Sequence, residues 1–298
     1  MGRRYPENLV VTDKALGNPA IQVNRIVWLA KFKMTKINLL ILLTVLGISN
    51  NSFSQDTIDL FIWAGQSNAQ GWQGDADFYP SDPDSLDSQV RLNYTFIGST
   101  SSNGWVEMQP QEGRFASGHF GPEVTFSRKL KEAGYNPAIF KYTRGSTSIH
   151  SDWLAPGEGG YYDAMVADLD TAITGLESQG HTVNIKGFIW IQGESDAETH
   201  ALASAYETSL LSIISDLRNN VVGNSTLPII LGVDEQHFWV VDQPAVLDAH
   251  KSIARNDDHT NFTSMYGLPK ADDTHLTPAG LMTHGEQIFE ALKPLLVK

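Results

Sequence analysis

The sequence TIDLFIWAGQSNAQG, residues 57–71, joins a short apolar run to a polar turn. Its apolar part, 57–63, has the length and the β-branched and aromatic content of a buried strand. Three further short apolar runs lie at 138–142, 185–191 and 228–233. Short apolar runs that alternate with longer segments of helical period are typical of a parallel sheet that is covered on both faces by helices.

Helical periodicity occurs between and after these runs. The segments that have it are 122–133, 162–178, 201–218, 245–254 and 278–296. We expect Pro122 at the first position of its helix and Thr277 as the N-cap of the last one. No internal repeat or low-complexity tract interrupts the pattern, so we predict one three-layer α/β/α domain with a mostly parallel, doubly wound, flavodoxin-like sheet.

The composition excludes several classes of protein. The chain has 298 residues, of which 41% are apolar and 10% aromatic, and its 34 acidic and 21 basic side chains give a net charge of −13. A disordered chain would have fewer aromatic residues, and a nucleic-acid-binding protein would be basic, so we expect no nucleic-acid partner. Because the chain has no cysteine, it forms no disulfide and no cysteine-ligated zinc site.

The charge is distributed unevenly along the chain. Residues 1–54 have seven Lys/Arg and two Asp/Glu, a net charge of +5, whereas residues 55–298 have a net charge of −18. Within the basic part, residues 34–54 read MTKINLLILLTVLGISNNSFS. A short basic head, an apolar run of roughly ten residues and a small-residue exit are typical of a secretory signal peptide. We predict cleavage between Ser54 and Gln55 and export of residues 55–298, to the periplasm or beyond.

The apolar run is shorter than the roughly 20 residues that span a bilayer. We therefore expect no membrane span in the mature chain, and an uncleaved anchor or a buried helix is the alternative. Residues 1–33 do not fit the short basic head of a signal peptide, and their Asn, Pro and Gly content does not predict a domain. Our hypothesis is that Met34 is the true start and that 1–33 is a mis-called or non-native extension.

Ligands bind at the carboxyl ends of the strands in such a sheet, so the polar residues after each run are candidates for a site. Ser67 lies in the turn that follows the first run, two residues after Gly65. On a tight turn its hydroxyl would be exposed as a nucleophile, and its own N–H would point toward a bound oxyanion. The alternative is an ordinary helix-capping serine.

A second candidate is the sequence ADDTHLTP, residues 271–278. A carboxylate three residues before His275 reaches its Nδ1 and leaves Nε2 free to take a proton from serine. The spacing favours Asp272 over Asp273 as that carboxylate. The alternatives are a solvated acidic loop, or a metal site. Such a site would use residues of this loop and of an Asp-His pair upstream, namely Asp272, Asp273, His275, Asp258 and His259.

Two more strand or helix ends carry suitable groups. The third apolar run ends in QGESD, where Gln192 could donate to an oxyanion and Glu194 could orient its loop or a cation such as Arg144. Gly121, in HFGPE at the start of the helix predicted at 122–133, offers an unhindered backbone N–H as another donor. A surface loop and a plain helix cap are the alternatives.

Taken together, four motifs in this order resemble the SGNH (GDSL-like) hydrolase superfamily. They resemble specifically its carbohydrate acetylesterase branch, which includes sialate O-acetylesterase and family six acetylxylan esterase. The motifs are GQSN at 65–68, HFGPE at 119–123, WIQGESD at 190–196 and DDTHLTPAG at 272–280. The resemblance extends from residue 58 to the last predicted helix and implies a serine esterase that needs no cofactor and no metal.

The resemblance also implies roles for individual residues. Ser67 would be the nucleophile, His275 the general base and Asp272 its partner. The oxyanion would be held by the N–H groups of Ser67 and Gly121 and by the side chain of Gln192, at a position where the wider superfamily commonly has Asn. Apart from what the resemblance implies, we also expect supporting or substrate-binding roles for two neighbours of Ser67 and three loop residues, namely Gln66, Asn68, Arg144, Glu194 and Trp153.

The expected substrate is an acetylated carbohydrate. Arg144 could contact a sugar carboxylate, and Trp153, Trp72 and Trp105 could stack on sugars, although loop aromatics are often part of the local core. Our main hypothesis is an exported esterase that removes O-acetyl groups from acetylxylan or related poly- or oligosaccharides through an acetyl-Ser67 intermediate. The alternatives are esters of sialic acid, lipid or cell wall, or a non-catalytic carbohydrate-binding relative.

Overall fold

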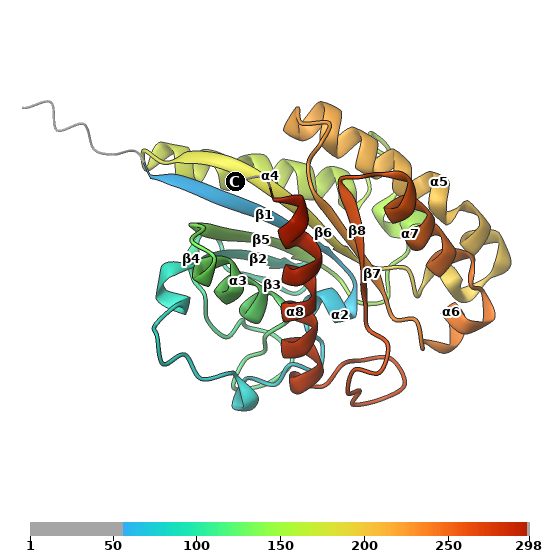
Figure 1. The fold of residues 1–298 in the computed structure, drawn as a ribbon, viewed down its shortest axis with the longest axis horizontal. Coiled ribbons are helices and arrows are strands. Elements are labelled where there is room, and N and C mark those ends of the chain that lie inside the picture. Colours follow the sequence, from blue (N-terminus) through green and yellow to red (C-terminus); the bar gives the residue numbers. More distant parts are fainter. Residues whose placement is uncertain (1–55, 297–298) are drawn as a thin grey trace, which may run out of the picture. The chain divides into compact units, whose positions relative to one another are not determined.

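One eight-stranded sheet forms the centre of residues 56–296, the part of the chain that this computed structural model describes (Figure 1). Its strands follow the order β3-β2-β5-β1-β6-β7-β8, and β4 pairs with β2. The strand bounds are β1 Thr57–Gly65, β2 Arg91–Phe96, β3 Thr100–Ser101, β4 Val106–Glu107, β5 Pro137–Thr143, β6 Thr182–Ile191, β7 Ile229–Val233 and β8 Thr260–Ser264.

All pairings among β2, β5, β1, β6, β7 and β8 are parallel, and only the short β3 and β4 run antiparallel to β2. The order β5-β1-β6-β7-β8 is the doubly wound flavodoxin order, to which β2 is added at one edge. The four predicted strands are therefore confirmed. The predictions missed β2 and β8, because β2 alternates buried and half-exposed residues and β8 is mostly polar, so neither forms an apolar run.

Helices cover both faces of the sheet (Figure 1). The side chains of α3 (Glu123–Glu132) and α8 (Pro278–Leu292) pack with one face, around Trp63 and Ile189. Those of α4 (Tyr161–Ser178), α5 (His200–Asp216) and α7 (Ala245–Asn256) pack with the other, around Ile62 and Trp190. The prediction of a three-layer α/β/α domain is confirmed, and it explains why β1 is apolar on both sides.

The helix bounds differ from the predictions in detail. Pro122 is the N-cap of α3 rather than its first helical residue. Thr277 caps α8 as predicted, with its side chain accepting a hydrogen bond from the N–H of Gly280. The helix predicted at 201–218 ends at Asp216 and continues as a π-helical segment, and the last helix ends at Leu292. Two short helices were not predicted, namely α2 (Ser67–Gln70) and α6 (Phe238–Asp242).

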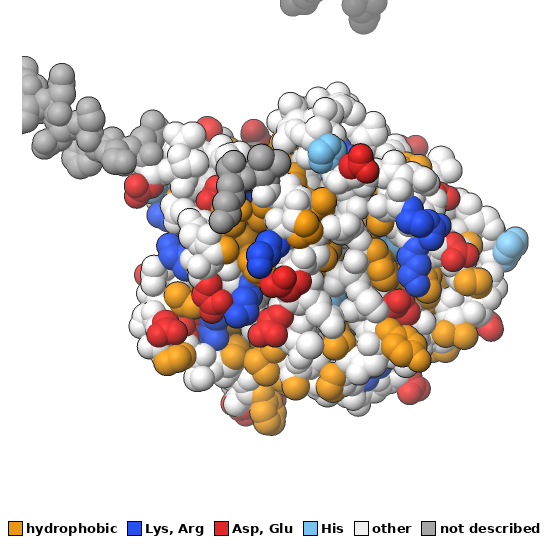
Figure 2. Space-filling model, in the orientation of Figure 1, with side chains coloured by type: hydrophobic (Ala, Val, Ile, Leu, Met, Phe, Trp, Pro, Cys, Tyr) orange, Lys and Arg blue, Asp and Glu red, His pale blue; other side chains and the backbone are white. Residues whose placement is uncertain are grey.

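On the face that α8 crosses, acidic and basic side chains are interspersed (Figure 2). None of the helices in 56–296 combines the length and the apolar content that crossing a bilayer requires. The predicted extension 1–33 and signal peptide 34–54 lie outside the described residues, so they remain predictions.

Candidate active site

Ser67 stands at the turn between β1 and α2. A Cβ on Gly65 would lie 2.0 Å from the carbonyl oxygen of Ile191, and its φ is +139°, so only glycine permits this approach of β1 to β6. The chain then turns at once into the single turn of α2, with Ser67 as its first residue. Within the described residues the N–H of Ser67 has no hydrogen-bond partner. Ser67 therefore presents both a hydroxyl and an N–H at the carboxyl edge of the sheet.

Asp272 binds His275 in the loop before α8. Its Oδ1 and Oδ2 lie 3.0 and 2.9 Å from Nδ1 of His275, and Oδ1 also accepts the N–H groups of Thr274 and His275. Partial burial alone would raise the pKa of Asp272, but these bonds and one from Gln73 lower it well below its ordinary value. Asp273 makes no such contact with the ring, so the structure brings Asp272 and not Asp273 to His275.

Asn68 fastens this loop to α2. Its Nδ2 donates to the carbonyl oxygen of Thr274 at 3.0 Å, and its Oδ1 accepts the N–H of Leu276 at 3.1 Å. The two bonds bracket His275 across more than 200 residues of sequence. Gln66, the N-cap of α2, is joined instead to the loop after β6, since its Oε1 accepts the N–H of Gly193 at 3.4 Å.

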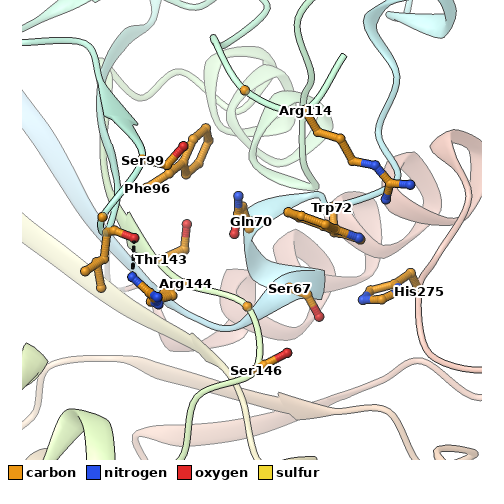
Figure 3. A pocket seen from close by; sticks show the side chains of 14 residues that line it. Ser67, Gln70, Trp72, Phe96, Ser99, Arg114, Thr143, Arg144, Ser146 and His275 are labelled. Carbon is orange, nitrogen blue, oxygen red and sulfur yellow. Dashed lines mark hydrogen bonds between the residues drawn. The ribbon is translucent and has the colours of Figure 1, made fainter.

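A cavity of about 510 Å³ contains both Ser67 and His275 in its lining (Figure 3). Arg144 and Arg114 also line it, and none of its lining residues within 56–296 is acidic. Arg114 stacks over Trp72, with its Cζ 4.9 Å from the ring centroid, and Arg144 donates to the carbonyl oxygen of Ile97 at 2.9 Å. Within the described residues Ser67 and His275 face the same cavity without a direct hydrogen bond.

Gly145 is a site residue that the sequence patterns did not reveal. It follows β5, lines the cavity, and lies so close to Ser67 that a Cβ added to it would be 3.4 Å from the Cβ of Ser67. In the described part of the chain its N–H, like that of Ser67, donates to no other group. The available signal in the sequence is a glycine three residues after the strand predicted at 138–142, in TRGST, where Arg144 is the more conspicuous residue.

The N–H of Gly121 was predicted to donate to the oxyanion, but Gly121 is not among the residues that line the cavity. Its N–H donates to Oε1 of Glu123 at 3.0 Å, and Glu123 is itself fully buried beside Lys141, with Oε2 and Nζ 2.9 Å apart. Lys141 Nζ also donates to the carbonyl oxygen of Gln70, the last residue of α2, at 2.8 Å. We therefore revise the donor role of Gly121, because the motif HFGPE builds a buried charged network beneath α2.

Gln192 is also directed elsewhere. Its side chain is fully buried, and Nε2 donates to the carbonyl oxygen of Thr147 at 2.8 Å and to Oδ2 of Asp196 at 2.6 Å. Both amide hydrogens are thereby used. We revise its predicted donor role accordingly: the amide ties the loop after β6 to the loop after β5.

Trp153 and Glu194 are interior residues too. Trp153 is fully buried, meets Trp190 edge-on at 4.8 Å and donates to Oγ1 of Thr147, so the predicted sugar contact is wrong. Glu194 accepts the N–H of Asp234, and no bond joins it to Arg144. Burial raises the pKa of Glu194 to about 7.

The two other tryptophans differ in position. Trp72 is 37% exposed and lines the cavity beside His275, with ring centroids 6.3 Å apart. Trp105 is half-buried and lies outside this cavity, with its Nε1 donating to the carbonyl oxygen of Ala172 at 2.8 Å. As for the metal alternative, residues 56–296 bring no three His, Asp or Glu side chains together in a way that could hold an ion.

The model of one protein family matches residues 57–293. It is described as a carbohydrate esterase family, sialic acid-specific acetylesterase. Among curated proteins no significant match is found.

Several solved structures share the fold. A protein from Arabidopsis thaliana has a TM-score of 0.64 and 22% identity, over 82% of this chain and 100% of that one. NanS has a TM-score of 0.57 and 16% identity, over 80% and 98%. A carbohydrate acetylesterase from Xanthomonas citri has a TM-score of 0.55 and 18% identity, over 80% of this chain and 56% of that one.

Proposed function

The chain belongs to the sialic acid-specific acetylesterase family of carbohydrate esterases and is therefore a carboxylic ester hydrolase, and we propose that it is an exported serine esterase that removes O-acetyl groups from carbohydrate. The observation that carries the proposal is the cavity that contains Ser67 together with His275, whose Nδ1 is held by Asp272. This is the arrangement that acyl transfer to serine requires.

In the proposed mechanism, His275 takes the proton of Ser67 through Nε2, and the Ser67 oxygen attacks the acetyl carbonyl carbon. The tetrahedral intermediate collapses as His275 returns the proton to the departing sugar oxygen, which leaves acetyl-Ser67. His275 then takes a proton from water, the hydroxide attacks the acetyl-enzyme, and acetate leaves as Ser67 regains its proton.

The developing negative charge on the carbonyl oxygen needs donors that are fixed in advance. We assign this role to the N–H groups of Ser67 and Gly145, because both are free in the described structure and the two residues lie close together. They replace Gly121 and Gln192, whose N–H donors are already bonded inside the protein.

Ser67→Ala tests the mechanism. We expect it to abolish acetate release from acetylated xylan and hydrolysis of 4-nitrophenyl acetate while the melting temperature stays near that of the wild type. Ser204→Ala, which changes an exposed serine beside His200 on α5 and outside this cavity, serves as the matched control. Labelling of the wild type but not of Ser67→Ala by a fluorophosphonate would exclude a non-catalytic binding protein. Residual turnover in a clean Ser67→Ala preparation would refute the assignment.

A second candidate substrate is an acetylated acidic sugar such as O-acetyl sialic acid. The supporting observation is that Arg114 and Arg144 are the charged side chains that the described structure places in the lining of the cavity beside His275, whereas residues 55–298 carry a net charge of −18. Arginine binds carboxylates well. If this candidate is right, Arg144→Gln should raise KM for O-acetyl sialic acid and leave KM for acetylated xylan unchanged.

A further inference from the structure

The cavity at Ser67 is the first of three that adjoin one another along the β2–β3 edge of the sheet. A second cavity of about 480 Å³ shares Phe96, Gly98 and Ser99 with it. In Figure 3 Phe96 and Ser99 lie at the end of the first cavity that is remote from His275. At that end the catalytic cavity therefore opens toward β3.

A third cavity, of about 380 Å³, continues from the second. The two share Thr95, Ser101 and Asn103, and the third reaches α4, where Asp168 and Trp105 line it. Each of the three cavities is within the size range of small-molecule sites, roughly 300–1,000 Å³. One acetylated sugar unit needs only the first, so the other two offer room for further units.

The linings of the second and third cavities have a different charge from that of the first. Hydroxyl and amide groups predominate, from Thr95, Thr100, Ser101 and Asn103, and the charged side chains are Glu112 and Asp168. Among the described residues no Lys or Arg lines either cavity, whereas the first has two arginines. Such a surface provides hydrogen bonds for sugar hydroxyls and repels a polyanion.

Trp105 provides an aromatic surface in the third cavity. Its bond from Nε1 to the carbonyl oxygen of Ala172 fixes the ring in place, so little side-chain entropy is lost when a ligand stacks on it. Aromatic rings offer an apolar surface with a polar handle, which suits the apolar face of a pyranose.

We propose that the three cavities form one binding groove for a chain of neutral sugars, whose acetylated unit occupies the cavity of Ser67 and His275. The proposal rests on the proposed function and adds its substrate class: an oligo- or polysaccharide that is neutral beyond the acetylated unit, rather than a free acetylated monosaccharide.

The test measures kcat/KM for acetylated xylose, for acetylated xylo-oligosaccharides of increasing length, and for 4-nitrophenyl acetate. We expect kcat/KM to rise with sugar chain length in the wild type. Trp105→Ala should lower it for the longer substrates by roughly threefold to tenfold, the size of an aromatic contact. Its activity on 4-nitrophenyl acetate should not change.

Two further variants distinguish the loss of a sugar contact from misfolding. Asn103→Gly removes the amide shared by the second and third cavities and keeps a residue that tolerates the positive φ of 53°. It should reduce the chain-length effect in the same way. Phe238→Ala removes an aromatic that is 56% exposed and lines none of the three cavities, and it should behave as the wild type.

The outcomes separate the two proposals. Equal kcat/KM for acetylated xylose and the longer sugars, or a chain-length effect that survives in both Trp105→Ala and Asn103→Gly, would overturn the groove alone. Hydrolysis of 4-nitrophenyl acetate with no acetate released from any sugar would overturn the proposed function itself.

Discussion

At the scale of single residues, Asp272 holds His275 both by its ring Nδ1 and by the peptide N–H groups of the loop. The bonds that lower the pKa of Asp272 keep the carboxylate ionised, and an ionised acceptor fixes the tautomer in which Nε2 is free.

Asp272→Asn should therefore lower kcat on the order of 10⁴-fold, which is the loss expected in a Ser-His-Asp triad when the histidine is held in the wrong tautomer, with little change in KM. Asp273→Asn is the matched control, because Asp273 makes no contact with the ring, and it should keep wild-type kcat. Steady-state kinetics on 4-nitrophenyl acetate measures both. A similar loss in the two variants would mean that the loop, and not the carboxylate, is responsible.

Asn68 acts on the same histidine from α2. Asn68→Ala removes the bonds to Thr274 and Leu276, so the loop should become less well fixed and kcat should fall by about 10–100-fold, because misplacement by about 1 Å is enough for such a loss. The measurement compares kcat of Asn68→Ala with kcat of Asn68→Asp, because the aspartate can still accept the N–H of Leu276 and so keeps one of the two bonds. Unchanged kcat in Asn68→Ala would remove the residue from the site.

At the scale of elements, the buried pair of Lys141 on β5 and Glu123 on α3 supports α2 from beneath. Burial lowers the pKa of Lys141, and the adjacent carboxylate opposes this. Lys141 also donates to the carbonyl oxygen at the end of α2. The pair therefore connects β5, α3 and α2.

Lys141→Met should leave Glu123 buried without its partner and lower the free energy of unfolding by about 3–5 kcal/mol, whereas Glu123→Gln/Lys141→Met should recover much of it. Urea denaturation provides the measurement. Lys129→Met breaks an exposed pair with Glu132 and should cost less than about 1 kcal/mol. Equal losses from Lys141→Met and Lys129→Met would contradict the support that we assign to the buried pair.

The loop after β6 should make stability depend on pH. Burial raises the pKa of Glu194 to about 7, from an ordinary value of 4.5, and that of Asp196 to about 6. Between pH 4.5 and 7 the folded chain keeps a proton on Glu194 that the unfolded chain releases. The contribution of Glu194 to stability is therefore full below about pH 4.5 and is lost as the pH rises to about 7.

Glu194→Gln should reduce this decline in the free energy of unfolding, measured by urea denaturation across that pH range. The exposed Glu198 lies in the same loop, so Glu198→Gln should keep the wild-type slope. A slope that is the same in all three proteins would show that Glu194 is not protonated in the folded state.

At the scale of the whole molecule, the sheet brings the site together because parallel strands end on the same edge. Ser67 follows β1, Gly145 follows β5 and His275 precedes α8, and these segments meet at one cavity (Figure 3). β1 lies between β5 and β6, where the winding of the chain reverses, and such a reversal is the usual place for a ligand.

The prediction for the N-terminal part also concerns the whole chain. If residues 34–54 are a signal peptide, the exported protein should begin at Gln55, and N-terminal sequencing of the secreted or periplasmic fraction would show this. Leu40→Arg should block export, because the apolar run would be broken. Detection of residues 1–33 in the exported protein would contradict both the signal and the start at Met34.

The sequence by itself determined the elements whose signals are local. The apolar runs of β1, β5, β6 and β7 predict buried strands because both faces of a central strand are covered, and the spacing of Asp272 and His275 predicts their pairing because three residues of loop suffice for the contact. The four motifs also carried the family resemblance. The polar or half-exposed β2 and β8 gave no comparable signal.

Only the tertiary structure decided where the amide and N–H donors point. Gly121 and Gln192 lie at the expected ends of their elements, but Glu123, Thr147 and Asp196 accept their bonds, and these partners come from side-chain orientations and from distant loops. Trp153 was buried by packing against Trp190, and Trp105 came to line a cavity next to α4. Burial and hydrogen-bond partners depend on contacts between segments far apart in the chain, which no local pattern specifies.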